Sequence, residues 1–307
     1  PLGFLAVFSG WGAAGALAGL LVRFSQTVVD WHARWEPSWR VPDPPLWVAA
    51  SLALGLIGVA VTRRSRARWR VATITVTAVS LFLLLRHPFP PRVQPGALEV
   101  TAIDVGQGDA FFIAFPDGKL MLLDAGGLAG QAPQRVRLDT GEDVIAPYLW
   151  SRSIRRLHAV AVSHAHHDHA GGLPAIIRDF RPQEIWTADA ELGKRLAVGG
   201  RTPVRLIGAG GEFTYGGCRI QAFAPELGGR PASPDAASLV MRVCYGRRSF
   251  LFTGDMDPVS ERRLAQSGKL PASDVLKAPH HGSRRSTTPE LLAQLRPSVA
   301  LISAGFE

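Results

Sequence analysis

The sequence predicts a mixed α/β domain that follows a group of membrane-spanning helices. Three long uncharged runs precede residue 86, a Pro-rich segment comes next, and short strand-like runs then alternate with helical segments. Hydrophobic residues make up 47% of the 307 residues and charged residues only 19%, which excludes a disordered or coiled-coil chain. We therefore divide the chain into transmembrane or interfacial helices with a linker, residues 1–95, and an α/β domain, residues 96–307.

The uncharged runs are candidates for membrane spans. Residues 1–22 are long enough to cross the hydrocarbon core, whereas residues 46–62 and 71–85 are short against the usual ~20 residues. A buried helix of a soluble domain is the alternative for such short runs. Five arginines between residues 63 and 70 favour a membrane, because a strongly basic loop stays on the cytoplasmic side. We expect a multi-pass protein of the inner cell membrane whose α/β domain is extracytoplasmic.

The segment between the first two runs, residues 23–45, has apolar side chains at helical spacing: Phe24, Val28, Trp31 and Trp35. This spacing predicts an amphipathic helix that lies in the membrane interface, and an ordinary packed helix is the alternative. Residues 87–96 contain four prolines and a glycine, so they form an extended linker rather than a helix.

The α/β domain has its elements in a clear order. Apolar runs and alternating patterns predict strands at residues 98–104, 110–115, 120–123, 157–162, 184–187, 218–223, 238–245, 249–252, 274–276 and 299–302. Helical patterns occupy residues 144–149, 172–180, 258–266 and 289–295. Strand pairs mixed with crossover helices indicate a mixed α/β fold.

Six of the nine histidines fall in two clusters, Ser163-His164-Ala165-His166-His167-Asp168-His169 and His280-His281. The first cluster directly follows a predicted buried strand and precedes two glycines, a place from which side chains point into a cleft. Imidazoles and a carboxylate are ligands for zinc or another transition metal. His164 and His166 can bind one ion, and Asp168 and His169 can bind a second ion beside it.

These motifs resemble those of the metallo-β-lactamase superfamily. The resemblance is carried by the His-x-His-x-Asp-His segment, by Thr253-Gly254-Asp255 at a strand end, and by Leu123-Asp124-Ala125-Gly126. Two longer motifs, Asp104-Val105-Gly106-Gln107-Gly108-Asp109-Ala110 and Leu276-Lys277-Ala278-Pro279-His280-His281-Gly282-Ser283, are similar to the ComEC family of DNA-uptake competence proteins. The resemblance implies an αββα metal-hydrolase sandwich attached to the end of a membrane channel domain.

The resemblance also implies roles for single residues. It implies two divalent metal ions, with zinc favoured and manganese also suitable, bridged by Asp255. His281 would bind the second ion, and His280 would reach the first ion or orient its neighbour. Asp124 would support the metal loop. Asp168 would serve both as a ligand and in catalysis of phosphodiester hydrolysis.

Several further residues have two interpretations. Lys277 would contact a phosphate, or is a surface lysine at a strand end. Ser283 would donate to a phosphate oxygen, or caps a turn. Asp109 and Gln107 would line the cleft beside the ligands, or belong to a tight hairpin with required glycines. We expect His167, at a variable position of the motif, to lie on the surface.

The sequence departs from the superfamily pattern in one respect. No histidine stands between His169 and Asp255, where lactamases and thioester hydrolases of the superfamily have a third ligand for the first ion. Asp235 and Ser238 occupy the corresponding ComEC positions, so Asp235, a water or a second histidine must complete that site. The chain also lacks an initiator methionine and ends before a further family motif, so we expect a C-terminally truncated part of a longer protein.

The function that this resemblance implies is hydrolysis of the DNA strand that is not imported. Its partners would be single-stranded DNA, the lipid bilayer and DNA-delivery proteins of the competence machinery. A membrane-anchored hydrolase of lactams, lactones or thioesters is one alternative, and a catalytically degenerate module that guides DNA is another. Residues 96–307 carry a net charge of only +2, a weak footprint for DNA binding. Cys218 and Cys244 can pair outside the cytoplasm or stay reduced.

Overall fold

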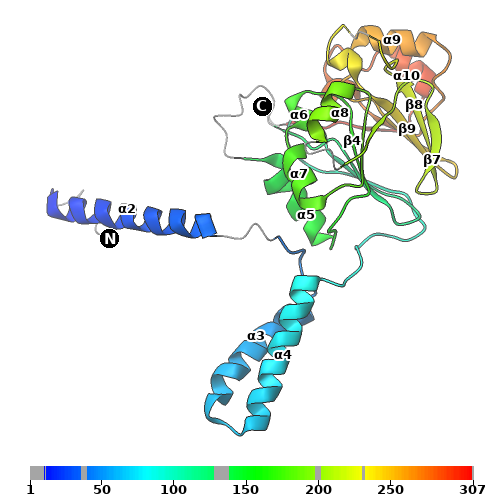
Figure 1. Cartoon of the computed structure of the whole chain (residues 1–307). Coiled ribbons are helices and arrows are strands. Elements are labelled where there is room, and N and C mark those ends of the chain that lie inside the picture. Colours follow the sequence, from blue (N-terminus) through cyan, green and yellow to red (C-terminus); the bar gives the residue numbers. More distant parts are fainter. Residues whose placement is uncertain are drawn as a thin grey trace. The chain divides into compact units, whose positions relative to one another are not determined.

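The computed structural model describes Gly10 and residues 12–35, 40–127, 138–197, 202–229 and 232–305, and the chain divides into two compact units, Pro1–Arg40 and Val41–Glu307. The first unit contains helix α2, Gly12–Trp35 (Figure 1). We expected a span that ends near residue 22 and a separate interfacial helix after it. That division is wrong: one helix runs through both segments, because neither Pro nor Gly interrupts residues 20–36. Residues 1–9 and 11 and the side chain of Trp35 lie outside the described residues.

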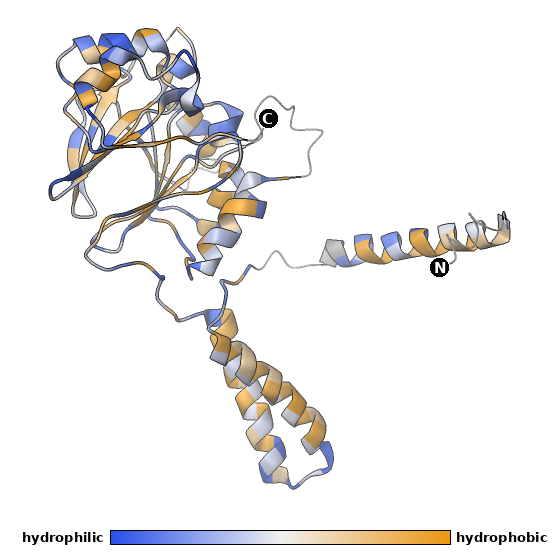
Figure 2. Ribbon diagram, turned by 180° about the vertical axis from the view of Figure 1, so that it is seen from behind, coloured by the Kyte–Doolittle hydropathy of each residue, from blue (hydrophilic) through white to orange (hydrophobic). Residues whose placement is uncertain are grey.

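The second unit begins with a helical hairpin. Helices α3 (Leu46–Val61) and α4 (Ala67–Arg86) are joined by the short turn η1 (Thr62–Arg64). A Cβ atom at Gly55 would lie 2.6 Å from Thr77 Oγ1, so glycine permits the close approach of the two helices. Outside this contact, the two helices expose apolar residues over most of their surface, as Figure 2 shows.

Among the residues that the structure describes, three helical stretches are long and apolar enough to cross a membrane: Gly12–His32, Leu46–Arg64 and Ala67–Arg86. The two runs that seemed short in the sequence gain length because the helices extend beyond the uncharged residues into the arginine-rich turn. The three helices fit a membrane protein.

The rest of the second unit is built on two six-stranded sheets. The first has the order β1-β2-β3-β4-β5-β6 and the second the order β12-β11-β10-β9-β8-β7. Strands β3 to β6 are parallel in the first sheet, and β10 to β12 are parallel in the second. The strand bounds are β1 Glu99–Ala102, β2 Phe111–Ala114, β3 Leu120–Leu123, β4 Ala159–Val162, β5 Glu184–Thr187, β6 Val204–Leu206, β7 Glu212–Tyr215, β8 Cys218–Ala224, β9 Val240–Tyr245, β10 Arg248–Phe252, β11 Val275–Lys277 and β12 Val299–Leu301.

Helices cover the outer face of each sheet. Alternation along β2 puts Phe111 in the core between the sheets and Phe112 in the core beneath the helices of the first sheet. On the second sheet, Leu276 packs in a third core with Leu264 and Leu291 of the covering helices. The predicted αββα order is therefore confirmed. The helices are α5 Ala146–Ser151, α6 His167–Ala170, α7 Leu173–Phe180, α8 Ala190–Leu196, α9 Pro258–Gln266 and α10 Pro289–Leu295, with a single π-helical turn, Gly141–Ile145, before α5.

The predicted strands agree with the structure to within a few residues, but α8, β6 and β7 were not predicted. Strands β6 and β7 are the outer edges of their sheets, and their residues are largely exposed or half-buried. Helix α8 is short and contains Gly193. Such edge elements lack the buried apolar face from which a pattern is recognised.

Candidate metal centre

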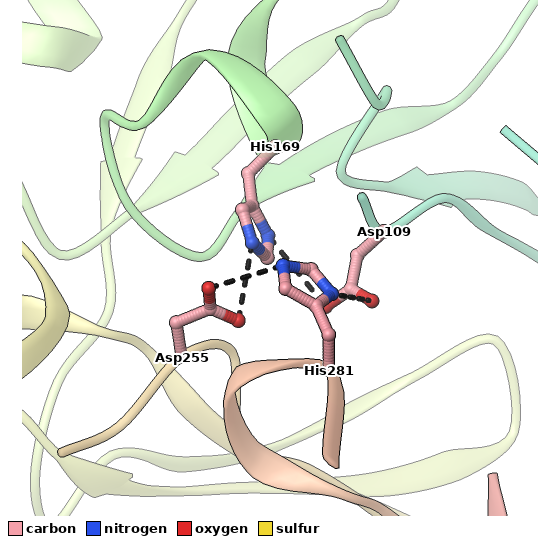
Figure 3. A group of neighbouring side chains, drawn as sticks. All are labelled: Asp109, His169, Asp255 and His281. Carbon is pink, nitrogen blue, oxygen red and sulfur yellow. Dashed lines mark ion pairs between the residues drawn. The ribbon is translucent and has the colours of Figure 1, made fainter. Parts of the chain in front are cut away.

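The candidate site lies at one edge of the sandwich, where strands of both sheets end. Strand β4 ends at Val162, just before the histidine-rich segment, while β10 ends at Phe252, shortly before Asp255. Strand β11 ends at Lys277, before the paired histidines, and Asp109 lies in the loop between β1 and β2. The fold thus brings residues from four separate segments together, as Figure 3 shows for one group of side chains.

The first group, called here the His169 group, consists of Asp109, Asp168, His169, Asp255 and His281. The Nε2 atom of His169 lies 3.1 Å from Asp255 Oδ1, and the Nε2 atom of His281 lies 3.2 Å from Asp255 Oδ2. Asp168 is half-buried and places its Oδ2 3.3 Å from His281 Nε2. Both Nε2 atoms are buried without a well-aligned hydrogen bond among the described residues. Converging imidazole nitrogens and carboxylates of this kind suit a divalent metal ion.

Asp124 fixes the orientation of the His169 ring. Its Oδ2 lies 2.9 Å from His169 Nδ1, and its Oδ1 accepts a hydrogen bond of 2.7 Å from the backbone N–H of Ser163. A carboxylate at Nδ1 selects the tautomer whose Nε2 is available for a metal. Asp124 thus supports the histidine loop on the side away from His169 Nε2, which is the supporting role that the resemblance implied. Ser163 was quoted within the motif but given no role; its position directly after a buried strand was the available signal.

Asp109 lies on the Nδ1 side of both rings rather than beside the Nε2 atoms. Its carboxylate oxygens are 3.6 Å from His281 Nδ1 and 3.6 Å from His169 Nδ1. Lys277 is only 1% exposed, pairs with Asp109 and lies 3.3 Å from Asp255 Oδ1. Of the two interpretations of Lys277, that of a surface lysine is therefore wrong, and the burial of the ammonium also argues against a contact with phosphate, which would arrive from the solvent. Since β11 is an inner strand, its last side chain is covered by the domain, and the two carboxylates compensate its charge.

Burial and charge act in opposite directions on the titration of this group. Burial favours the neutral form of Asp109, but the Lys277 ammonium and the His281 and His169 rings together outweigh it and lower the pKa of Asp109 to about 2. Burial would also lower the pKa of His169, but the Asp124 and Asp255 carboxylates together raise this pKa to about 10. Asp109 and Asp168 likewise raise the pKa of His281 to about 11 against the effect of burial. The group is therefore arranged to hold positive charge, which a metal ion or protons can supply.

A second group, called here the His164 group, consists of His164, His166 and Asp235. Asp235 Oδ1 lies 3.0 Å from His166 Nδ1 and 3.9 Å from His164 Nε2, and the latter is 3.1 Å from His166 Nδ1. Asp235 therefore stands where the sequence lacks a third histidine. His280 lies at the margin, with Nδ1 3.7 Å from Asp235 Oδ2. The rings of His164 and His169 have centroids 4.2 Å apart, so the two groups are neighbours. Burial, together with the nearby His169, lowers the pKa of His164 to about 3, which keeps this ring neutral as a ligand must be.

The paired histidines lie on an unusual piece of backbone. His280 and His281 have φ angles of 49° and 55°, in the left-handed region that side chains other than glycine rarely adopt. The following loop is anchored by Glu261 of α9, which is fully buried and accepts hydrogen bonds from the backbone N–H groups of Thr287 and Thr288 at 3.0 and 2.6 Å. Strained backbone that the surrounding structure holds in place is common where a protein positions functional side chains. The role of Glu261 was not predicted, because its sequence context is that of a surface helix.

The other singled-out residues lie away from the ligand atoms or at the margin of the site. Ser283 is half-buried at the end of the short turn that carries the histidines, and its carbonyl accepts a hydrogen bond from Ser286 N at 3.0 Å. Gln107 Oε1 accepts a hydrogen bond from Gly305 N at 3.0 Å. His167 is exposed, as predicted. Cys218 and Cys244 are both free thiols, so the structure has them reduced.

Comparison of the sequence with known proteins finds a matching family model and several relatives. Residues 103–305 match the family described as the Metallo-beta-lactamase superfamily. ComE operon protein 3 of Bacillus subtilis is 28% identical over 277 residues, which cover 86% of this chain and 35% of that protein. Recombination protein 2 of Haemophilus influenzae is 34% identical, covering 67% of this chain and 24% of that protein. Competence protein ComA of Neisseria gonorrhoeae is 28% identical, covering 71% and 28%. The chain spans about a third or less of each relative.

Proposed function

We propose, from the premise that this chain belongs to the metallo-beta-lactamase superfamily, that its α/β domain is a metal-dependent phosphodiesterase acting on DNA during uptake. The superfamily and the candidate metal centre indicate a metal-dependent hydrolase. The resemblance to ComEC-type competence proteins is confirmed by the relatives, which support a role in DNA uptake. The observation that carries the proposal is the convergence of His169, Asp255 and His281, with two buried Nε2 atoms that lack hydrogen bonds among the described residues.

The chain offers ligands for two divalent ions. In this proposal His164, His166 and Asp235 hold the first ion, while His169, His281 and Asp168 hold the second. Asp255 lies between the two imidazoles of the His169 group, and it would serve as the carboxylate common to both ion sites. We propose zinc as the resident metal, and manganese as the second choice, because both accept mixed imidazole and carboxylate ligands. When bound, such ions activate a water at neutral pH and neutralise charge on phosphate oxygens.

The protein's own residues prepare this chemistry. Asp124 holds the His169 ring so that Nε2 faces the ligand position, and Asp109 occupies the equivalent place behind His281. Lys277 compensates the charge of Asp109 and Asp255, so that carboxylates can stay ionised in the interior. Half-buried Asp168 lies at the more open side of the group, where a substrate can approach. With ions held by both ligand groups, a substrate phosphate would lie between these groups, and hydrolysis would consume one water molecule, form a new P–O bond and release the leaving oxygen as an alcohol.

The alternative activities receive less support. A lactam or thioester hydrolase of the superfamily would have a histidine at the position that Asp235 occupies beside His166. A guiding module without catalysis would not need two complete groups of ligands arranged side by side. We therefore keep phosphodiester hydrolysis as the proposed reaction, with single-stranded DNA of the strand that is not imported as the substrate.

The proposal includes a place in the cell. The three apolar helices would anchor a multi-pass protein in the inner membrane, with the arginine-rich turn in the cytoplasm and the α/β domain on the opposite side. DNA-delivery proteins of the competence machinery would then present the substrate to this domain.

A nuclease assay on the whole chain in detergent tests the proposal. The substrates are an end-labelled single-stranded oligonucleotide and a chromogenic β-lactam, each with and without a chelator. We expect cleavage of DNA only, abolished by chelation and by Asp168→Ala combined with His169→Ala. His167→Ala is the matched control, because this exposed histidine lies in the same segment. Turnover of the lactam alone, or DNA cleavage that survives both treatments, would show that the reaction is misassigned.

A further inference from the structure

The outer face of the second sheet carries a cavity lined by arginines. The cavity, called here the arginine groove, has a volume of about 610 Å³, and five of its lining residues are Arg219, Arg242, Arg247, Arg248 and Arg296. Alternation explains why they gather there. Cys218 and Val243 face the core between the sheets, so their neighbours on β8 and β9, Arg219 and Arg242, face outward.

Most of the positive charge in the groove is not compensated by acids. Arg219 pairs with Glu212 at 2.8 Å, and Arg248 lies 3.3 Å from Asp274. Within the described part of the chain, Arg242 donates hydrogen bonds to neutral oxygens, among them Ser273 Oγ at 3.0 Å and the carbonyl of Ala272 at 2.8 Å.

The two remaining arginines of the groove are exposed and can contact a ligand from solution. Arg247 and Arg296 are exposed, and neither makes an ion pair in the part of the chain that the structure describes. The groove therefore offers three guanidinium groups without a carboxylate partner, those of Arg242, Arg247 and Arg296.

The positive net charge of the α/β domain is concentrated in the arginine groove. Its five arginines, less Glu212 and Asp274, carry a net charge of +3, whereas residues 96–307 together carry only +2. The rest of the domain is therefore slightly acidic. A weak average charge had argued against binding of DNA, but the structure concentrates the positive charge in one recess, and local charge is what a polyanion contacts.

We propose that the arginine groove binds the phosphate backbone of single-stranded DNA at a position separate from the metal centre. Arg248 begins β10 and Asp255 follows its other end, so a five-residue strand, roughly 17 Å long, separates the groove from the ligand groups. The recess suits a flexible strand, whereas a flat lipid surface would favour protruding basic and apolar side chains. The choice of DNA as the polyanion rests on the proposed function, and the groove would hold the strand during hydrolysis at the metal centre.

Binding without catalysis tests this inference. Fluorescence anisotropy with a labelled 20-nucleotide oligothymidylate, in chelator, measures the affinity of the whole chain in zwitterionic nanodiscs. Arg247→Glu with Arg296→Glu is compared with Arg156→Glu with Arg195→Glu, which makes the same change in net charge at two other exposed arginines. The first pair should weaken binding roughly tenfold, and it should reduce the slope of the logarithm of the binding constant against the logarithm of the salt concentration by about 1.4. The control pair should change the affinity less than twofold.

Two results would overturn the inference. Equal weakening by both pairs would mean that DNA responds only to the total charge. Unchanged DNA affinity with reduced binding to phosphatidylglycerol vesicles would make the groove a lipid-binding face. The milder pair Arg247→Gln and Arg296→Gln, checked by its melting temperature, separates a binding defect from misfolding. Binding is measured in chelator, which suppresses hydrolysis in every sample. If the protein bound DNA in this assay but failed to cleave DNA in the nuclease assay without chelator, the proposed function would be contradicted and this inference would stand.

Discussion

Lys277 and Asp109 form an ion pair that the domain encloses almost completely, on the Nδ1 side of the His281 ring. The same ammonium lies 3.3 Å from Asp255, so one lysine compensates two carboxylates of the His169 group. Such a pair is costly to build, because both charges leave water, and it is more costly to break. The pair therefore links the stability of the domain to the arrangement of its metal ligands.

Removal of the lysine should destabilise the protein strongly. Lys277→Met leaves two buried carboxylates without their ammonium partner, and we expect a loss of about 3–5 kcal/mol in the free energy of unfolding, measured by urea titration. Lys269→Met is the matched control, because Lys269 is exposed. Adding Asp109→Asn to Lys277→Met should recover part of the loss. A cost close to zero for Lys277→Met would contradict the pairing described here.

The melting temperature of the metal-free protein should fall as pH rises. Folding raises the pKa of His169 from its ordinary value of 6.5 to about 10, and that of His281 to about 11. A group with a raised pKa stabilises the fold fully below its unfolded pKa and loses this contribution as pH rises through its folded pKa. We therefore expect a decline that starts above about pH 6.5 and is complete near pH 11.

A bound metal ion should reverse the dependence of the melting temperature on pH. An ion that binds at the Nε2 atoms displaces protons, so its apparent affinity should rise over the same pH range. Melting curves at about pH 7 and pH 9, in chelator and in zinc, measure both effects. If the metal-free protein melted at the same temperature at both pH values, the imidazoles would not be held charged by their carboxylate neighbours.

The metal content should follow the two ligand groups. We expect two ions per chain in the wild type, measured by plasma mass spectrometry after dialysis against zinc. His166→Ala removes a ligand of the His164 group and should leave one ion, while His281→Ala should leave at most one. His167→Ala, at the neighbouring exposed histidine, should retain two. A wild-type chain that retains no ion would favour the guiding module over the hydrolase.

The sequence could predict much of this architecture, because the buried strands are short apolar runs. Strand β4, with four fully enclosed residues, and the histidines directly after it are a pattern that a single chain reveals. The contacts that hold the ligand residues in place were not predictable from the sequence. Burial of Lys277 depends on the neighbours of β11 in the sheet, and the support by Glu261 depends on how α9 packs. The gathering of arginines on one face likewise arises from strand pairing, since Arg219 lies opposite Cys244 only in the folded sheet.

The orientation of the membrane part can be tested by cysteine labelling. In a background with Cys218→Ala and Cys244→Ser, one cysteine is introduced at Ser65, which is exposed in the turn between α3 and α4, or at Arg195, which is exposed on α8. Five arginines around the turn resist transfer across the membrane, so Ser65→Cys should be protected from an impermeant maleimide in spheroplasts and should react only after lysis. Arg195→Cys should react in both samples, because in the proposed topology α4 would lead the chain back across the bilayer before the α/β domain begins. The opposite pattern would place the metal centre in the cytoplasm and would rule out hydrolysis of incoming DNA before its passage.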